Sequence, residues 1–386
     1  MNSPIISIIT PSYNQGHYLE ETILSVITQE GDFSIDYLIM DGGSTDNSVE
    51  IIRRYSDMLA SGTFVCKCKG VSIRWASEKD KGQSDAINKG ITQSHGEILT
   101  YINSDDLFSP GAFAHVVKFF HLNPESDFVY GDGDVIDERG ETIWEWLSRP
   151  YRHSVMLSYH FLWNDFSNYI MQQSTFWRRR AVNRIGLFDA SFHYAMDAEY
   201  WIRAGDAGLV LSHLREKLGK FRLIRGTKSL SSPTVFWEDY LEIFRKYRKN
   251  RGLSKYLAFY YFNLALSFNL DVDRAFLSDR RLFERWNSLE EKVRKSLSRQ
   301  ANRGKSICRL VVANEHRKKN EPMNGAKQIR RVLKEDPLIL FHPFGAFYAL
   351  RYLLSIVGGG RVDRWQAGLA SWYRRNRYDY RYHAND

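Results

Sequence analysis

Along its first 135 residues, the chain alternates short apolar runs with stretches whose apolar residues recur at helical spacing. After the first run, Leu19, Ile23, Val26 and Ile27 form one such stripe, and Val49, Ile52 and Tyr55 form another. The runs that predict strands lie at residues 5–9, 35–40, 73–76 and 98–102. Strands that alternate with helices in this way are typical of βαβ units and a parallel sheet.

Two adjacent carboxylates, Asp105 and Asp106, follow the apolar run 98–102 within the sequence Asn103-Ser104-Asp105-Asp106. Open α/β sheets bind ligands at the carboxyl ends of their strands. Neighbouring carboxylates resist joint ionisation unless a cation compensates them, and hard oxygen ligands suit Mg²⁺ or Mn²⁺ with substrate phosphates. The alternative is a turn in which Asp106 or Ser109 caps a helix begun by Pro110. This segment alone leaves both interpretations open.

Other polar segments also follow predicted strands. The turn at residues 10–16 lacks G-x-G-x-x-G, and Gly42-Gly43 lacks the ending of a Walker loop, which argues against NAD-dependent and P-loop chemistry. Ser44 or Thr45 is a candidate cap for the helix that follows. Further along, residues 170–176 predict a strand, and residues 180–185 predict a helix. Residues 140–200 are rich in aromatic side chains. Such side chains can stack on sugar rings, or they can fill an ordinary hydrophobic core.

The length of 386 residues predicts a main domain with a smaller addition. Three cysteines do not indicate a disulfide framework, and Cys66-Lys67-Cys68 lacks the second pair of a zinc site. The run 5–9 is too short for a secretory signal core. A cytoplasmic location is therefore expected.

Charge divides the chain into an acidic front and a basic tail. Residues 240–386 contain 31 Lys+Arg against 14 Asp+Glu, a net of +17, which leaves −8 for residues 1–239. Such a tail suits a polyanion, either nucleic acid or an anionic lipid leaflet. Its apolar stretches at 256–270 and 337–360 leave three alternatives: interfacial helices, helices packed on the front domain, and a transmembrane helix, for which the first stretch is short. No helix-turn-helix, RNP or zinc pattern is present, so nucleic acid is not an expected partner.

The segments at 10–14, 41–46, 80–90 and 103–106, in this order, resemble the family 2 glycosyltransferases of the GT-A fold over roughly residues 4–215. The likeness is to the branch that builds bacterial surface polysaccharides such as O-antigen. It implies an α/β fold with a Rossmann-like mixed sheet. The expected organisation is a GT-A catalytic domain at residues 1–239 and a mainly helical region at 240–386.

The resemblance also implies where a nucleotide diphosphate sugar would bind. The first loop and the aspartate of the second would hold base and ribose, and the 81–85 stretch would lie along ribose and diphosphate. A carboxylate can accept the uracil N3 proton, and a tyrosine ring can stack on the base. Each role has a structural alternative: residues 41–43 could be a turn that needs the backbone freedom of glycine, and Lys81 could be a solvated surface lysine. The residues that these roles involve are Pro11, Tyr13, Asn14, Asp41, Lys81, Gly82 and Asp85.

Residues 103–105 take the place of the family's D-x-D motif, with Ser104 in the donor site. Since Asn103 replaces the first aspartate, Asp105 is the main expected ligand of Mg²⁺ or Mn²⁺. Asp106 would bind the metal through water, position Asp105, or cap a helix.

Asp197, near the start of a predicted helix, matches the family's catalytic base. Met196 stands where many members have Glu, and Glu199 is the fallback base, with a helix-surface position as its alternative. Arg222, Arg225 and Lys228 are alternative candidates for a phosphate clamp.

The resemblance therefore predicts an inverting, metal-dependent glycosyltransferase. It would move a sugar from a nucleotide diphosphate, most simply UDP, to a hydroxyl of a glycan or lipid-linked acceptor in surface polysaccharide biosynthesis. The basic tail suggests a peripheral enzyme on the inner face of the cell membrane. The alternative is a catalytically silent nucleotide-sugar-binding protein that docks a partner enzyme.

Overall fold

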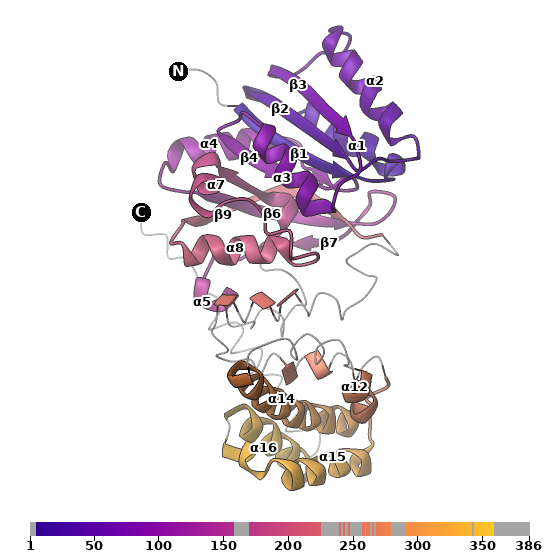
Figure 1. Cartoon of the computed structure of the whole chain (residues 1–386), viewed down its shortest axis with the longest axis vertical. Coiled ribbons are helices and arrows are strands. Elements are labelled where there is room, and N and C mark those ends of the chain that lie inside the picture. Colours follow the sequence, from indigo (N-terminus) through magenta and orange to yellow (C-terminus); the bar gives the residue numbers. More distant parts are fainter. Residues whose placement is uncertain are drawn as a thin grey trace. The chain divides into compact units, whose positions relative to one another are not determined.

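The computed structural model describes residues 5–157 and 170–224, separate residues between 239 and 278, and 291–358 without 342. The chain divides into two compact units, Met1–Tyr247 and Arg248–Asp386 (Figure 1). The predicted boundary after residue 239 therefore lies inside the first unit.

A mixed sheet forms the centre of the first unit, with strands in the order β3-β2-β1-β4-β8-β6-β9-β5, and β7 pairs with β6. The strands β1, β2, β3 and β4 are parallel, whereas β8 runs antiparallel to β4 and β6. The strand bounds are β1 Ile5–Ser12, β2 Gly31–Asp41, β3 Cys68–Ser77, β4 Ile98–Tyr101, β5 Leu107–Phe108, β6 Phe128–Ile136, β7 Thr142–Trp146, β8 Thr175–Arg178 and β9 Leu211–Arg222.

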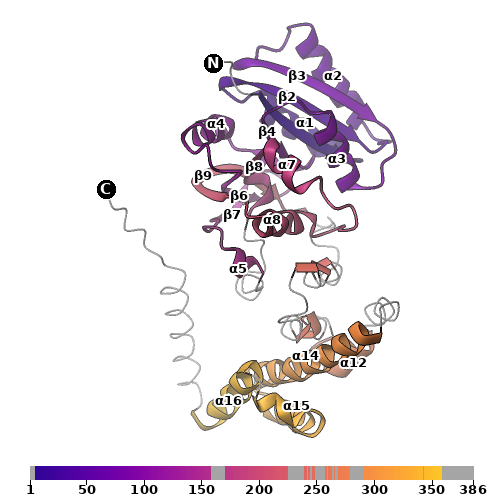
Figure 2. The same ribbon diagram turned by 60° about the vertical axis from the view of Figure 1, so that its left-hand side comes forward.

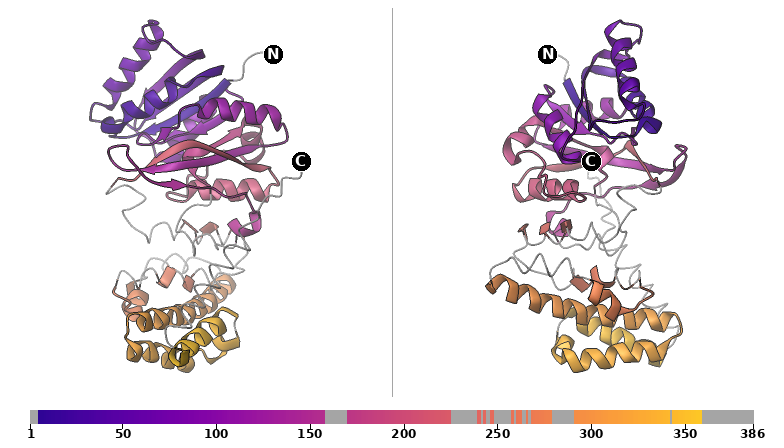
Figure 3. Two further views of the ribbon diagram at one scale, coloured as in Figure 1. Left: turned by 180° about the vertical axis from the view of Figure 1, so that it is seen from behind. Right: turned by 45° about the vertical axis from the view of Figure 1, so that its right-hand side comes forward.

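Helices cover both faces of this sheet (Figures 1 and 3). Apolar residues of α1, α2 and α4 share one core with Ile6 and Ile8 of β1. On the opposite face α3 approaches β1 so closely that a Cβ on Gly90 would lie 2.5 Å from Cγ2 of Ile9. The helix bounds are α1 Gly16–Ile27, α2 Ser48–Ala60, α3 Gln83–Gln93, α4 Ala112–Leu122, α5 His153–Met156, α7 Arg179–Ile185 and α8 Met196–Asp206.

The four strands and two helices predicted at the front of the chain are confirmed. The predicted apolar stripe of α1 is buried. In α2 the buried stripe includes Ile51, which was not predicted, whereas the predicted Val49 is only half-buried. The prediction that Ser44 or Thr45 caps α2 is wrong, because Oδ1 of Asp46 accepts the backbone N–H of Ser48 at 3.0 Å instead.

Residues 170–176 differ from the predicted strand. A 3₁₀ turn, η1 (Gln172–Ser174), precedes β8, which begins only at Thr175. The predicted helix at 180–185 is confirmed as α7. Several aromatic residues of this region belong to the core, namely Phe176, Trp177, Phe188, Phe192, Tyr200 and Trp201. Others lie outside the described residues, namely Tyr159, Phe161, Trp163, Phe166 and Tyr169.

The second unit is helical in its described residues. Figure 2 shows α15 and α16 lying along the long helix α14. Nη2 of the buried Arg309 donates to Oδ1 of Asp273 at 2.8 Å and joins α14 to α12. In the described part of the chain, no helix combines the length and the apolar character needed to cross a membrane. The bounds are α12 Val272–Ser278, α14 Glu291–Lys318, α15 Pro322–Glu335, η2 Pro337–Phe341 and α16 Pro343–Gly358.

Candidate functional site

The polar segments that sequence analysis singled out in residues 1–106 lie along one edge of the sheet. Ser12, Asp41 and Ser77 are register partners at the carboxyl ends of β1, β2 and β3. In β4, Tyr101 pairs with Ile9, so residues 102–106 leave the sheet at the same edge. Parallel pairing thus brings the loops after these four strands together, as expected for an open α/β sheet.

Asp41 organises the loop after β2. Its buried carboxylate accepts hydrogen bonds from the backbone N–H groups of Gly43 and Ser44 at 3.1 and 2.9 Å. The hydroxyls of Ser44 and Ser77 donate to the same carboxylate at 2.5 and 2.6 Å. Gly43 has a φ of +85°, which glycine adopts without strain. The turn and the carboxylate are therefore one unit, with Asp41 holding the loop in shape.

Asn14 joins the loop after β1 to the loop after β2. Its backbone N–H donates to Oγ of Ser44 at 2.7 Å, and its Oδ1 accepts the N–H of Thr45 at 2.8 Å. These bonds explain why Ser44 and Thr45 do not cap α2. Between the two loops Tyr13 is 61% exposed, while Pro11 is buried within β1. The joined loops leave the Tyr13 ring accessible to a flat ligand.

Gly42 lies beside both Tyr13 and Asp80. A Cβ at this position would stand 3.4 Å from Cδ2 of Tyr13 and 2.9 Å from Oδ2 of Asp80. Asp80 is itself oriented by the N–H of Gly82, which donates to its Oδ1 at 2.8 Å. The absence of a side chain at residue 42 therefore preserves the space between the first three loops.

The 81–85 stretch turns sharply into α3. Gly82 has a φ of +112°, and Oδ2 of Asp85 accepts the N–H of Lys81 at 3.1 Å. Lys81 and Gly82 are exposed at the sheet edge. Nε2 of Gln83 donates to Oδ1 of Asn103 at 2.6 Å, which links this stretch to the segment after β4.

Asp106 is a buried structural carboxylate. Its oxygens accept hydrogen bonds from N of Arg222 at 2.8 Å, Nε2 of Gln173 at 2.8 Å and Nδ2 of Asn103 at 3.1 Å. Burial, and then the charge of Asp105, raise its pKa well above the usual value. The predicted cap of a helix after Pro110 is wrong, because α4 begins at Ala112 and no side chain caps it.

Asp105 differs from its neighbour because its side chain is partly exposed. Burial raises its pKa, and the nearby guanidinium of Arg222 opposes this shift. The hydrogen bond from Arg222 goes to the backbone carbonyl oxygen of Asp105 and not to this carboxylate, and Ser104 beside it is buried. Within the described residues, no three His, Cys, Asp or Glu side chains form a group that could hold a metal ion. The donor set fits an ion that takes one carboxylate and completes its shell with phosphate oxygens and water.

Arg222 is the centre of the polar contacts beneath Asp105. Its Nε donates to the carbonyl oxygen of Asp105 at 2.9 Å, and its Nη2 pairs with Oε2 of Glu21 at 2.6 Å. Nη1 donates to the carbonyls of Asp137 and Glu138 at 3.3 and 3.2 Å. The side chain is buried and fully engaged, which disfavours Arg222 as the phosphate clamp. The two alternatives, Arg225 and Lys228, lie outside the described residues.

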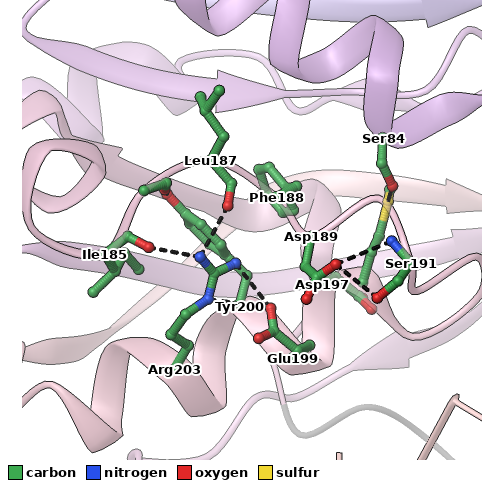
Figure 4. A network of polar contacts seen from close by, with 12 residues as sticks. Ser84, Ile185, Leu187, Phe188, Asp189, Ser191, Asp197, Glu199, Tyr200 and Arg203 are labelled. Carbon is green, nitrogen blue, oxygen red and sulfur yellow. Dashed lines mark hydrogen bonds and ion pairs between the residues drawn. The ribbon is translucent and has the colours of Figure 1, made fainter. Parts of the chain in front are cut away.

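Asp197 stands in the first turn of α8, as predicted, and its Oδ1 accepts the N–H of Ala198 at 2.7 Å. Burial raises the pKa of the Tyr101 phenol well above the usual value, and the nearby carboxylates of Asp197 and Asp106 raise it further. The hydroxyl of Ser84 on α3 contacts Sδ of Met196 at 2.8 Å (Figure 4).

Glu199 is buried in the side of α8, so the helix-surface alternative is wrong, and its role as the fallback base stays a prediction. Arg203 donates to Oε2 at 2.9 Å and to the carbonyls of Ile185 and Leu187 (Figure 4). Oε1 accepts Nζ of Lys246 at 3.0 Å and the hydroxyl of Tyr247. Glu199 is a structural anchor.

Sequence analysis missed two residues that shape this site, Gln173 and Asp239. Gln173 supports Asp106, and the adjacent glutamines in an otherwise apolar run were a signal that this segment departs from a regular strand. Asp239 supports the loop before α8 by accepting the N–H groups of Tyr194 and Ala195 at 2.6 and 3.0 Å. No local pattern around residue 239 marks this contact.

Comparison with known proteins gives a family match over residues 7–186 to "Glycosyl transferase family 2". A glycosyltransferase named for PGL/p-HBAD biosynthesis in Mycobacterium bovis is 26% identical over 213 residues, which are 53% of this chain and 70% of the relative. An uncharacterised glycosyltransferase of Rickettsia typhi is 25% identical over 52% of this chain and 58% of its own length. An uncharacterised glycosyltransferase of Rickettsia felis is 28% identical over 36% of this chain and 21% of its own length.

Among solved structures, S. aureus TarS 1–349 in complex with UDP-GlcNAc has a TM-score of 0.48 at 14% identity, over 84% of this chain and 91% of that one. The Pyrobaculum calidifontis mannosyltransferase PcManGT, in complex with GDP-Man and Mn²⁺, has a TM-score of 0.46 at 14% identity, over 98% of this chain and 88% of that one. Both scores are below 0.5, so the assignment rests on the family match and on the strand order described above. Residues 7–186 match the family 2 glycosyltransferases, and the strands and helices described above give this part of the chain a mixed α/β fold.

Proposed function

We propose that the chain transfers a sugar, with inversion at the anomeric carbon, from a nucleotide diphosphate donor to an acceptor hydroxyl. The observation that carries this proposal is a pair of contacts that joins the segment after β4 to the start of α8 through the first turn of α3. Nε2 of Gln83 donates to Oδ1 of Asn103 at 2.6 Å, and the hydroxyl of Ser84 contacts Sδ of Met196, the residue before Asp197, at 2.8 Å. These contacts support a site in which a diphosphate and metal bind at the end of β4 with the carboxylate of Asp197 beside them. A leaving group and a proton acceptor would then be available within one site.

The donor nucleotide would bind over the joined loops after β1 and β2. Tyr13 offers an exposed ring for stacking on the base, and Gly42 leaves room beside it. Pro11, Asn14 and Asp41 shape these loops, and Asp41 remains the candidate acceptor for a uracil N3 proton. Lys81, Gly82 and Asp85 would follow the ribose and diphosphate. UDP is the proposed carrier.

Asp105 would hold Mg²⁺ or Mn²⁺ together with oxygens of the donor diphosphate. Such an ion neutralises the charge that develops on the leaving group. Asp106 was expected as a second ligand, and that stays a prediction. Its burial and its three protein donors favour the other expected role, in which it holds the segment that presents Asp105 and Ser104.

Asp197 would act as the general base. The acceptor oxygen forms a bond to the anomeric carbon from the side opposite the diphosphate, the bond from that carbon to the diphosphate oxygen breaks, and the hydroxyl proton moves to the carboxylate of Asp197. A positioned base contributes about 10²–10⁴-fold in rate. The half-exposed position of Asp197 at the start of α8 suits this role better than that of the buried Glu199.

The test is a thermal-shift screen of UDP, GDP and dTDP sugars with and without Mn²⁺, followed by transfer assays. Asp105→Ala should abolish the metal-dependent shift, and Asp197→Asn should keep it while transfer falls about 10²–10⁴-fold. Asp206→Asn, at the exposed end of α8, is the control and should transfer normally. Donor turnover unchanged in both variants would instead favour the silent nucleotide-sugar-binding protein.

The acceptor is proposed to be a glycan or lipid-linked saccharide of a surface polysaccharide, such as O-antigen, reached from an anionic membrane surface. Two observations support the membrane: the net charge of +17 in residues 240–386, and a row of exposed apolar side chains on η2 and α16. Basic residues near an anionic leaflet add attraction to apolar insertion. The exposed row contains Leu338, Phe341, Phe347, Leu350 and Leu353.

Flotation with vesicles tests this surface. The full chain should bind vesicles that contain anionic lipid and lose that binding when Phe341 and Leu350 are both changed to Ser. Met323→Ser, an exposed apolar residue of α15 outside the row, is the control. Concentration-dependent dimerisation that the double variant abolishes, without vesicle binding, would assign the row to a second copy of the chain.

A further inference from the structure

The loop that leads into α8 is held by a carboxylate from a much later part of the chain. Oδ2 of the buried Asp239 accepts hydrogen bonds from the backbone N–H of Tyr194 at 2.6 Å and of Ala195 at 3.0 Å. Ala195 is the N-cap residue of α8, and its side chain offers no acceptor for the helix. Asp239 therefore fixes the backbone two residues before Asp197.

A second contact from the same part of the chain holds α8 one turn further on. Nζ of Lys246 donates to Oε1 of Glu199 at 3.0 Å and to Oδ2 of Asp189 at 3.2 Å, and the hydroxyl of Tyr247 also donates to Oε1. Glu199 is buried, so these donors satisfy a carboxylate that has no access to water. The first turn of α8 is thus held at its start and at its side.

Tyr240, next to Asp239 in sequence, is buried as well. Burial, and then the charges of Asp197 and Asp239, raise its pKa above the usual value. Burial and the charge of Asp197 likewise raise the pKa of Tyr101 at the end of β4.

We propose that Asp239 is a positioning residue for the general base. It acts through the backbone of Tyr194 and Ala195, and it places the carboxylate of Asp197 where an acceptor hydroxyl is deprotonated. Residue 239 lies outside the family match at residues 7–186. The inference rests on the proposed role of Asp197 as base.

The geometry has a kinetic consequence. A displacement of about 1 Å in a reacting group can cost about 10²-fold in rate. Loss of the Asp239 carboxylate releases the two N–H groups and lets the first turn of α8 shift, whereas the donor loops on the other strands are untouched. The effect should therefore fall on kcat with the acceptor present and not on donor binding.

The test compares Asp239→Ala with Asp239→Asn in the full chain. The amide oxygen of Asn can accept the same two N–H donors, so Asn should retain nearly all activity, and Ala should lower kcat about 10- to 100-fold with an unchanged donor KM. Hydrogen exchange at Tyr194 and Ala195 should be faster in the Ala variant only. Asp206→Ala, at the other end of α8, is the matched control and should change neither measurement.

Coupling to the base is measured with the double variant Asp197→Asn, Asp239→Ala. If Asp239 acts through Asp197, the second change adds less than about twofold to the loss. If the two losses of rate multiply in the double variant, or if hydrogen exchange is unchanged in Asp239→Ala, then Asp239 is not a positioning residue. The loss of transfer in Asp197→Asn would still identify Asp197 as the base. If Asp197→Asn transfers at the normal rate, the proposed base is wrong, and with it the inference.

Discussion

The backbone N–H of Arg222 donates a hydrogen bond of 2.8 Å to Oδ1 of Asp106, a residue 116 positions earlier in the chain. The guanidinium of the same arginine donates to the carbonyl of Asp105 at 2.9 Å. The end of β9 therefore holds the segment after β4 through both backbone and side chain. The carboxylate proposed to bind metal is presented by this contact.

Changing Arg222 to Lys should destabilise the first unit by about 2–4 kcal/mol, because the carbonyls of Asp105, Asp137 and Glu138 and the carboxylate of Glu21 lose the buried guanidinium that donates to them. Urea unfolding measures the change. Arg54→Lys is the matched control, since Arg54 also pairs with a glutamate of α1 at 2.6 Å but is exposed. Equal, small effects of the two substitutions would show that burial of Arg222 contributes nothing.

Changing Gly42 to Ala should weaken donor binding about tenfold, which corresponds to about 1.4 kcal/mol. The new methyl group would lie 2.9 Å from Oδ2 of Asp80 and 3.4 Å from the ring of Tyr13, so the base loses its space. Titration with UDP measures the affinity. Gly70→Ala in β3, where a Cβ meets nothing within 4 Å, should leave the affinity unchanged, and normal UDP binding by Gly42→Ala would place the base elsewhere.

Changing Asp36 to Asn should lower stability at neutral pH. Burial alone would raise the pKa of Asp36, but hydrogen bonds from Arg74, the N–H of His95 and Ser7 outweigh it and hold the pKa below its usual value. A carboxyl whose pKa is lowered by folding contributes stability above its unfolded pKa, about 3.9, and loses it as the pH falls through the folded value. The difference between variant and wild type should therefore shrink as the pH falls below about 4.

Urea unfolding at pH 7, 5 and 3 measures this dependence on Asp36. Asp32→Asn, on the same strand but in an exposed pair with Lys69, should show no comparable change with pH. A difference for Asp36→Asn that stays constant across this range would exclude the lowered pKa as its cause.

Changing Glu199 to Gln should reduce stability by about 2–4 kcal/mol, because Arg203 and Lys246 lose a buried carboxylate partner. Activity of the folded variant should keep the wild-type pH profile, since Glu199 is not the proposed base. Glu78→Gln, whose glutamate pairs with Lys89 on the surface, is the control and should unfold like the wild type. A variant of normal stability that loses the acidic limb of its pH profile, where a carboxylate base becomes protonated, would make Glu199 the base.

Local pattern was sufficient for the front of the sheet. Apolar runs of about the right length, separated by helical stripes, predicted β1 to β4 and α1, because strand and helix periodicity is set by residues close in sequence. The same pattern predicted that Asp41, Lys81 and Asp105 would meet at one edge, since parallel strands end together. It was less accurate for the start of α2, where the N-cap residue is Asn47, because Ser44 bonds to Asn14 of another loop.

Sequence by itself determined the likeness to the family 2 glycosyltransferases, the order of strands and helices at the front of the chain, and the edge at which polar residues collect. Tertiary structure alone decided that Asp106 is buried against Gln173 and Arg222, and that Glu199 is an anchor. It also brought Asp239 to the start of α8. These contacts join residues 44 or more positions apart, and burial of a carboxylate depends on such distant partners rather than on neighbouring residues.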